Sequence, residues 1–337
     1  MKTKGLIFLA GLTIVAVGAT STILRTNPSR IVSDRRGEVV FPDLPGAGGD
    51  ITLIDIQDGD RSIAIERKDN GFVAAGSNYP VKIEPLRDLV ATLANLRFEE
   101  AKTADPARYS DLGLGEPGSK GEAGKFVTIK KQNGAVVASL LVGNRDMSVG
   151  GSLGGTYAKL GDAQSYLLRG EVKIPSMKAD WFDANLVKIG RESIAKIELN
   201  GGGRDKITLT SAEAGKELEL ADVPEGREAD ASNLSRLSSM MESLDFQDVR
   251  KASATKSDAP RQLIAQTREG LRLELTLVSE AGNDSWIRIA ASSTNESSSA
   301  QAKEIAAKVE GREFRLPGYQ GDIFGWSMNE MTTERKS

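Results

Sequence analysis

Apolar residues recur at three- and four-residue steps over residues 85–98, a spacing that places them on one face of an α-helix. The residues that carry this pattern are Leu86, Leu89, Val90, Leu93 and Leu96. A similar pattern returns about 150 residues later, where LSSMMESLDFQDVRKAS at 237–253 matches LVATLANLRFEEAKTAD at 89–105. The correspondence indicates that one structural unit is present twice.

Alternating apolar and polar residues predict β-strands around each of these helices. In the first copy we expect strands at 51–56, 62–67, 72–74, 126–130, 135–142, 156–160 and 165–168, with a hairpin turn at Asn133-Gly134. In the second copy we expect strands at 194–199, 206–210, 217–220, 262–266, 271–278 and 286–290. A helix over 230–244 would begin with Asp230 as its N-cap, and a last amphipathic helix is expected over 299–310.

These elements predict an α+β fold with two tandem copies of a mainly antiparallel sheet-plus-helix unit, preceded by one N-terminal transmembrane helix. A chain of 337 residues is long enough for two domains of ordinary size. The expected parts are a membrane anchor or signal peptide at 1–25, a linker at 26–50, the first repeat at 51–190, the second at 191–330 and a tail at 331–337.

The N-terminal segment is apolar enough to interact with a membrane. Residues 5–24 are uncharged and mostly apolar, and at about 1.5 Å per residue they just span a hydrocarbon core of roughly 30 Å. A cleaved signal peptide with its apolar region at 6–17 is the alternative. Because short tails before a first apolar segment usually stay inside, we place the body outside the cytoplasm, held at the inner membrane by a single pass.

The composition restricts the available chemistry, because the chain contains no cysteine and no histidine. Thiol nucleophiles, disulfides, Ser-His-Asp triads and the usual zinc, copper and haem sites are therefore excluded. The net charge of −3 provides no basic excess for binding nucleic acid. We predict that the protein is not an enzyme, and that it has no catalytic residue, cofactor or metal site.

Two short motifs suggest chemistry that their surroundings do not support. Gly113, Gly115 and Gly118 spell the G-x-G-x-x-G of dinucleotide sites, but that motif needs a buried strand before it and a helix after it. Ser253 and Lys256 spell the S-x-x-K of penicillin-recognising enzymes, whose partner motifs S-D-N and K-T-G are absent. We interpret the first as a structured turn and the second as a polar surface loop.

Asp180 and Asp183 flank Trp181 and could form a carboxylate pair beside a sugar-stacking aromatic, as in a glycosidase. Two acids three residues apart more often lie on a solvated face. No calcium-loop pattern and no Walker sequence occurs in the chain.

Several features together resemble the bacterial domain-of-unknown-function family 4340. They are the N-terminal apolar segment, the FPDL sequence at 41–44 before the first strand, the repeated helix, YSDLGLGEP at 109–117, and LLVGN at 140–144 followed by TYAKL at 156–160. The resemblance implies an extracytoplasmic, single-pass accessory subunit of an ABC-type transport complex. Its implied partners are an ABC-2-type permease and an auxiliary membrane protein related to gliding-motility transport.

Two other functions remain open at this point. A ligand-binding module would capture a glycan, lipid or peptide in a cleft between the two repeats, with Trp181, Trp286 or Trp326 contributing aromatic contacts. An envelope hydrolase would need at least two carboxylates that converge in one cleft with separated pKa values.

Overall fold

The computed structural model describes residues 35–69, 71–118, 124–149, 151–211, 213, 216–254, 260–281 and 284–335. These residues form two compact units. The second comprises Val73–Val81 and Ser176–Ser337, and the first comprises the preceding part of the chain as far as Phe72 together with Lys82–Pro175. A short hairpin of the N-terminal half therefore belongs to the second unit.

The first large sheet is antiparallel and has the strand order β4-β3-β2-β1-β6-β7-β8-β9-β5. Its strands are β1 (Ile51–Gln57), β2 (Ile63–Lys68), β3 (Gly71–Ala74), β4 (Tyr79–Pro80), β5 (Arg97–Ala101), β6 (Lys125–Lys131), β7 (Val136–Asp146), β8 (Gly155–Lys159) and β9 (Ser165–Arg169). The alternation of apolar residues in β1 and β6 buries Ile54, Val127 and Ile129. The helix α2 (Ile83–Asn95) buries Leu86, Leu89 and Leu93, as its sequence periodicity predicts.

The second large sheet has the order β13-β12-β11-β17-β18-β19-β20-β16. Its strands are β11 (Ile194–Asn200), β12 (Ile207–Thr210), β13 (Glu219–Leu220), β16 (Asp248–Lys251), β17 (Gln262–Thr267), β18 (Leu271–Ala281), β19 (Asp284–Ser293) and β20 (Arg312–Arg315). Two-stranded sheets join β10 (Asn185–Val187) to β15 (Leu244–Asp245) and β14 (Arg227–Ala229) to β21 (Thr332–Glu334).

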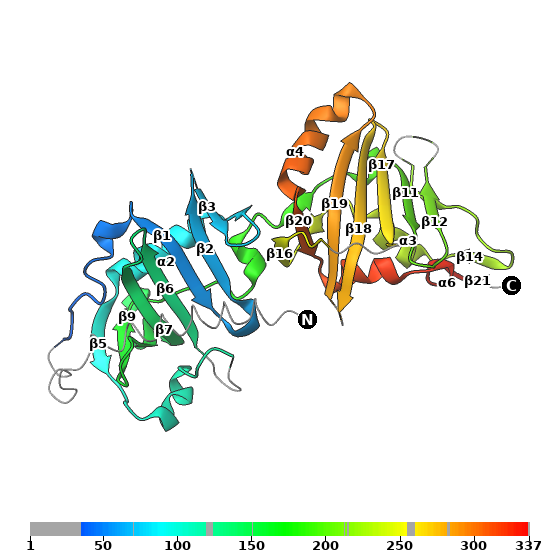
Figure 1. Cartoon of the computed structure of the whole chain (residues 1–337). Coiled ribbons are helices and arrows are strands. Elements are labelled where there is room, and N and C mark those ends of the chain that lie inside the picture. Colours follow the sequence, from blue (N-terminus) through cyan, green and yellow to red (C-terminus); the bar gives the residue numbers. More distant parts are fainter. Residues whose placement is uncertain are drawn as a thin grey trace. The chain divides into compact units, whose positions relative to one another are not determined.

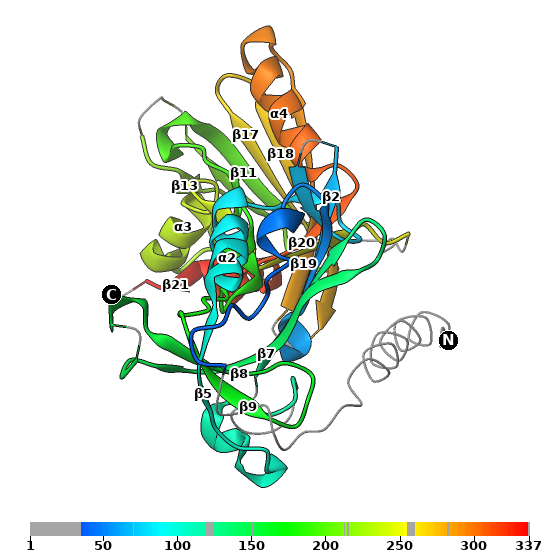
Figure 2. The same cartoon turned by 90° about the vertical axis from the view of Figure 1, so that its left-hand side faces the viewer.

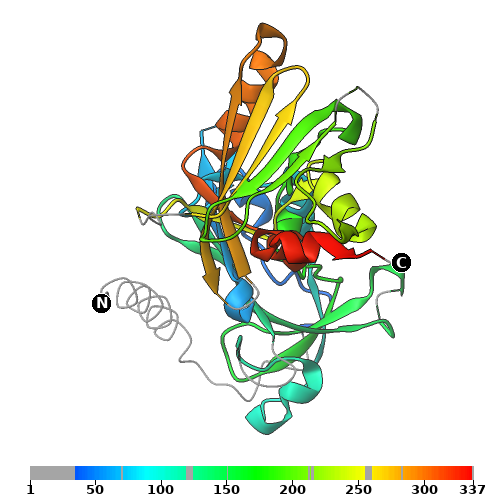
Figure 3. The same ribbon diagram turned by 90° about the vertical axis from the view of Figure 1, so that its right-hand side faces the viewer.

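The helices of the second unit are α3 (Ala231–Ser238), α4 (Ser299–Val309), α5 (Gly318–Gly321) and α6 (Met328–Met331). Figure 1 shows α4 lying along β19, and Figure 3 shows the C-terminal helices in red beside the same sheet. Short 3-10 helices connect many of the elements: η1 (Pro45–Ala47), η2 (Gly59–Arg61), η3 (Pro106–Arg108), η4 (Ser110–Leu112), η5 (Gly151–Leu153), η6 (Lys178–Trp181), η7 (Arg191–Ser193), η8 (Glu296–Ser298) and η9 (Asp322–Gly325).

The predicted fold class, an α+β fold of tandem sheet-plus-helix copies behind a transmembrane helix, is wrong. The structure is mostly antiparallel sheet, with 40% of residues in strands and 24% in helices, and it contains several sheets. Because the helical segments are short, more backbone groups form their hydrogen bonds between paired strands than within helices. The two large sheets do share one strand order, since β3-β2-β1-β6-β7-β8-β9-β5 corresponds to β13-β12-β11-β17-β18-β19-β20-β16.

The helix predicted over 230–244 illustrates the difference. Asp230 is its N-cap, as expected, because its carboxylate accepts a hydrogen bond from the Asn233 amide. The helix ends at Ser238, and Leu244 enters β15 instead of a fourth helical turn. In the part of the chain that the structure describes, no helix is long and apolar enough to cross a membrane. The apolar segment at 5–24 lies outside the described residues.

The hairpin Val73–Val81 places Tyr79 in the core of the second unit. The Tyr79 ring packs edge-on against Phe182, Phe246 and Phe314, with centroid separations of 5.6, 5.2 and 5.8 Å. Its hydroxyl donates to the Asp183 carbonyl at 3.1 Å. The side chain is 2% exposed, so this hairpin is part of the hydrophobic core.

Candidate functional site

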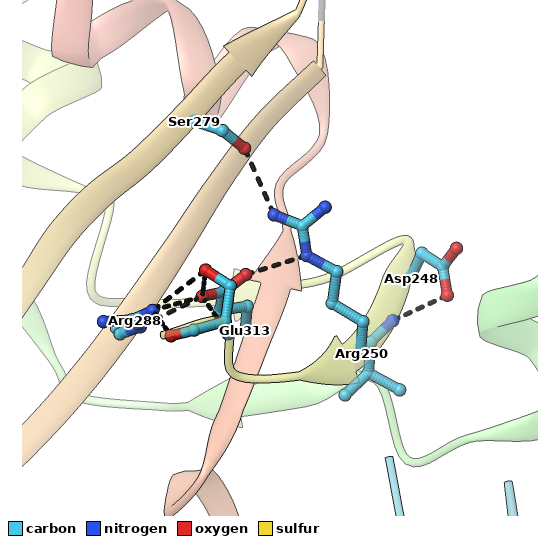
Figure 4. A network of polar contacts seen from close by, with 7 residues as sticks. Asp248, Arg250, Ser279, Arg288 and Glu313 are labelled. Carbon is cyan, nitrogen blue, oxygen red and sulfur yellow. Dashed lines mark hydrogen bonds and ion pairs between the residues drawn. The ribbon is translucent and has the colours of Figure 1, made fainter. Parts of the chain in front are cut away.

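A buried carboxylate in the second unit is surrounded by basic side chains from neighbouring strands (Figure 4). Glu313 of β20 lies directly opposite Arg250 of β16, and Arg250 Nε donates to Glu313 Oε2 at 2.8 Å. Arg288 of β19 donates to Glu313 Oε1 through Nε at 3.0 Å and Nη2 at 2.6 Å. The Glu313 side chain is completely buried, so its charge depends on these two guanidinium groups.

Ser253 donates two further hydrogen bonds to this carboxylate. Its backbone amide and its hydroxyl donate to Glu313 Oε1 at 2.9 and 3.0 Å. Burial by itself would raise the pKa of Glu313, but the hydrogen bonds from Ser253, Arg288 and Arg250 outweigh it and lower the pKa. The ionised carboxylate is a weak base, and the Ser253 hydroxyl is already donated to it. Ser253 therefore has a structural role, and Lys256 of the S-x-x-K motif lies outside the described residues.

The outer side of this network presents an arginine stacked on a tryptophan. The Arg250 guanidinium carbon lies 4.0 Å from the centroid of the Trp286 ring, and Arg250 Nη2 donates to the Ser279 hydroxyl at 3.2 Å. The Arg250 side chain is 43% exposed. We call Arg250, Trp286 and Ser279 the Arg250–Trp286 surface. Because Glu313 holds the Arg250 guanidinium through a hydrogen bond, the stacked pair of Arg250 and Trp286 is already ordered before a partner binds.

In the first unit, the YSDLGLGEP sequence forms a folded clasp. Tyr109 donates its hydroxyl to the carbonyls of Ala163 and Ala104, and its own carbonyl accepts from the Leu114 amide at 2.8 Å. Tyr109 and Leu114 pack with Leu141 in a small buried cluster. The clasp therefore attaches this segment to the strand that carries LLVGN.

Two glycines make the close approach between these motifs possible. A Cβ at Gly113, where φ is +66°, would lie 2.3 Å from Asn144 Oδ1, and a Cβ at Gly143 would lie 2.3 Å from the Leu112 carbonyl oxygen. Gly113 directly follows the 3-10 helix η4, whereas a dinucleotide site requires a buried strand at that point. The first half of the G-x-G-x-x-G motif thus serves this packing.

The same region holds a hydrogen-bonded pair and a small hollow. Tyr157 donates to Asp146 at 2.7 Å; this bond is the main cause that raises the pKa of Tyr157 to about 12. The Ser148 hydroxyl is the main cause that lowers the pKa of Asp146 to about 2, and the Tyr157 bond adds to it. The hollow has a volume of about 160 Å³, below the roughly 300–1,000 Å³ of typical ligand pockets. It is lined by Glu100, Ala101, Lys102, Thr103, Arg108, Asp111 and Leu112.

The carboxylates beside Trp181 have separate roles. Asp180 accepts a hydrogen bond from the Met177 amide at 3.2 Å and so caps η6. Asp183 is 75% exposed and pairs with Lys308 at 3.2 Å. Trp181 is 1% exposed and Trp326 is 7% exposed, whereas Trp286 is half-buried at the surface of its sheet.

The Arg250, Arg288 and Glu313 network was not identified from the sequence. Strand alternation places Arg288 on the face opposite Ile287 and Ile289, which is a usable signal for one of its members. Within the described part of the chain, no group of three or more acidic side chains is arranged to hold a metal ion.

Comparison with known proteins identifies a family. The family model described as "Domain of unknown function (DUF4340)" matches residues 72–264. This range extends from β3 in the first sheet to β17 in the second, and it includes the YSDLGLGEP clasp. No curated protein and no solved structure matches the chain.

Proposed function

Since the chain belongs to the DUF4340 family, we propose that it is a non-catalytic accessory subunit of an ABC-type transport complex in the cell envelope. In this proposal residues 5–24 anchor the chain in the inner membrane, and the two units lie outside the cytoplasm as a platform for protein contacts. The partners are an ABC-2-type permease and its auxiliary membrane protein.

The observation that carries the proposal is the Arg250–Trp286 surface. Arginine and tryptophan are the residue types that most often dominate the binding energy of protein interfaces, especially when they are rigidly held. Here Glu313 is buried and fixes Arg250 at 2.8 Å, while Trp286 supports the same guanidinium from one side. A partner that covers this pair would gain contacts without the entropic cost of ordering a long side chain.

The roles of the other polar groups also support binding rather than catalysis. Ser253 donates its hydroxyl to an ionised carboxylate, and Asp180 caps a 3-10 helix. Each of these groups has a partner that stabilises the fold, so its polar atoms are used for structure.

The test is co-purification from mildly solubilised membranes of the native host. The full chain, tagged at its C-terminus, is expected to retain a permease and a second membrane subunit. Recovery of the chain alone, under conditions that keep other membrane complexes intact, would refute the proposed function.

Variants of one surface then locate the contact. Arg250→Ala combined with Trp286→Ala is expected to lose most of the retained permease. Arg272→Ala is the control, because Arg272 lies on β18 of the same sheet, is 33% exposed and forms a surface ion pair with Glu274 at 3.2 Å. Equal recovery of the permease by both variants would move the contact elsewhere and leave the function itself intact.

A further inference from the structure

Five residues from adjacent segments form one row across the end of the first sheet. Asp146 of β7 pairs with Gly155 of β8, Gly155 with Arg169 of β9, and Arg169 with Arg97 of β5. Val39 forms a bridge with Arg97 on the outer side. With neighbouring strands about 4.8 Å apart, the row is roughly 19 Å wide. Figure 2 shows β5, β8 and β9 together at this end of the first unit.

An apolar tip extends beyond this row. β7 ends at Asp146 and β8 begins at Gly155, so residues 147–149 and 151–154, which connect them, lie outside the sheet. Met147 is 57% exposed and Leu153 is 63% exposed in this connection. Gly155 has space for the neighbouring Val149 side chain because it lacks a Cβ, which would lie 2.5 Å from Val149 Cγ2. The connection thus shields Val149 in part and exposes the two larger apolar side chains, Met147 and Leu153.

Exposed basic side chains surround the apolar tip, while the acids that pair with them are shielded. Arg36 and Arg169 share Glu99; their side chains are 73% and 45% exposed, and that of Glu99 only 8%. Arg145 and Lys173 share Glu171 in the same way, with exposures of 51%, 79% and 18%. With Arg97 and Asp146 of the row and the Arg35–Glu38 ion pair beside it, six basic and four acidic groups give this end a net charge of +2, in a chain whose net charge is −3.

The beginning of the described chain lies at the same end. Arg36 reaches the carboxylate that Arg169 also contacts, and Arg35 packs over the Phe98 ring at 3.9 Å. Figure 1 shows these first residues beside β5. Only ten residues separate Leu24, the end of the apolar segment, from Arg35, a distance of at most about 40 Å when fully extended. An anchor formed by residues 5–24 would therefore keep this end of the first unit near the membrane surface.

We propose that the end of the first unit formed by Met147, Leu153 and the surrounding arginines docks on an anionic lipid bilayer. Met147 and Leu153 enter the boundary between headgroups and acyl chains, and Arg36, Arg145, Arg169 and Lys173 contact the lipid phosphates. An apolar tip surrounded by exposed cations is the combination that interfacial membrane binding requires. The inference rests on the anchor in the proposed function and adds that the folded body, too, touches the lipid.

The natural absence of cysteine allows a direct test on the full chain. Met147→Cys, Leu153→Cys and Val136→Cys are each labelled with a polarity-sensitive fluorophore and reconstituted into vesicles of zwitterionic lipid with or without anionic lipid. Val136 is the matched control, because it is 46% exposed and apolar but begins β7, at the opposite end of the strand from Asp146. Vesicle flotation reports the anchor separately from the probes.

We expect the probes at positions 147 and 153 to shift to shorter emission wavelengths in anionic vesicles. Lipids spin-labelled high in the acyl chain should quench them, and added salt should weaken both effects; the probe at 136 should stay as in water. Floating protein with no shift at 147 and 153 overturns the docking while the anchor stands. A concentration-dependent shift without lipid means that a second copy covers the tip, which also overturns it. If the protein does not float with the vesicles, both the anchor and the docking are refuted. Co-purification with the permease then tests the rest of the proposed function.

Discussion

Truncation of Tyr79 tests whether a residue from the N-terminal half stabilises the second unit. Its ring is 2% exposed and contacts three phenylalanine rings that come from positions more than one hundred residues away. Removing a buried aromatic ring costs roughly 3–5 kcal/mol, because transfer free energy is lost and a cavity remains. We therefore expect Tyr79→Ala to lower the free energy of unfolding of the second unit by about 4 kcal/mol.

Tryptophan fluorescence during urea unfolding is the assay, because all three tryptophans, Trp181, Trp286 and Trp326, belong to the second unit. With a slope of about 2 kcal/mol per M urea, the midpoint should fall by about 2 M. Tyr79→Phe removes only the hydrogen bond to the Asp183 carbonyl, so it should cost about 1 kcal/mol and shift the midpoint by about 0.5 M.

Phe72→Ala is the matched control, because Phe72 is a half-buried aromatic residue of the same strand β3 but belongs to the first unit. It should leave the tryptophan-detected midpoint unchanged. The reasoning would be refuted if Tyr79→Ala unfolded at the midpoint of the unchanged chain, or if Phe72→Ala had an equal effect.

Three further perturbations test the polar network and the clasp. Glu313→Gln should cost about 3 kcal/mol at pH 7 because it removes the buried negative charge that pairs with Arg250 and Arg288. The pKa of Glu313 is lowered in the folded state, so the stability that its ionised form provides is present above the ordinary pKa of 4.5 and is lost as the pH falls. Urea unfolding should therefore show a smaller difference in unfolding free energy between Glu313→Gln and the unchanged chain at pH 3 than at pH 7. Gly143→Ala should destabilise the first unit by about 1–3 kcal/mol, whereas Gly46→Ala, where a Cβ meets nothing within 4 Å, should not. Thermal melts followed by circular dichroism compare the two variants, and equal melting temperatures would contradict the packing of the clasp. Asp146→Asn should return the pKa of Tyr157 from about 12 toward 10, because it removes the carboxylate that accepts the Tyr157 hydrogen bond. In the unchanged chain, the stability that this hydrogen bond provides is present below pH 10 and should be lost as the pH rises to 12. Spectrophotometric titration measures the pKa shift, and a tyrosine pKa that does not change in the variant would contradict the hydrogen bond.

Local sequence patterns were sufficient to predict the elements whose periodicity is strong. Leu86, Leu89 and Leu93 predicted the buried face of α2, and Asn133-Gly134 predicted the turn between β6 and β7. Asp230 was correctly predicted as the N-cap of α3. These signals are local, because a helix face, a type of turn and a capping carboxylate depend on residues within a few positions of one another.

The fold class and the polar site depend on contacts between segments that are distant in the sequence. β5 has the sequence RFEEA and β16 the sequence DVRK; both are short and rich in charge, and they are strands only because β9 and β20 supply hydrogen-bonding partners. Glu313 meets Arg250 and Arg288 from segments 63 and 25 positions away. Contacts between distant segments depend on register, which local periodicity does not specify. For the same reason no local pattern identifies Tyr79 as a core residue of the second unit, and the folded chain places it among three phenylalanine rings.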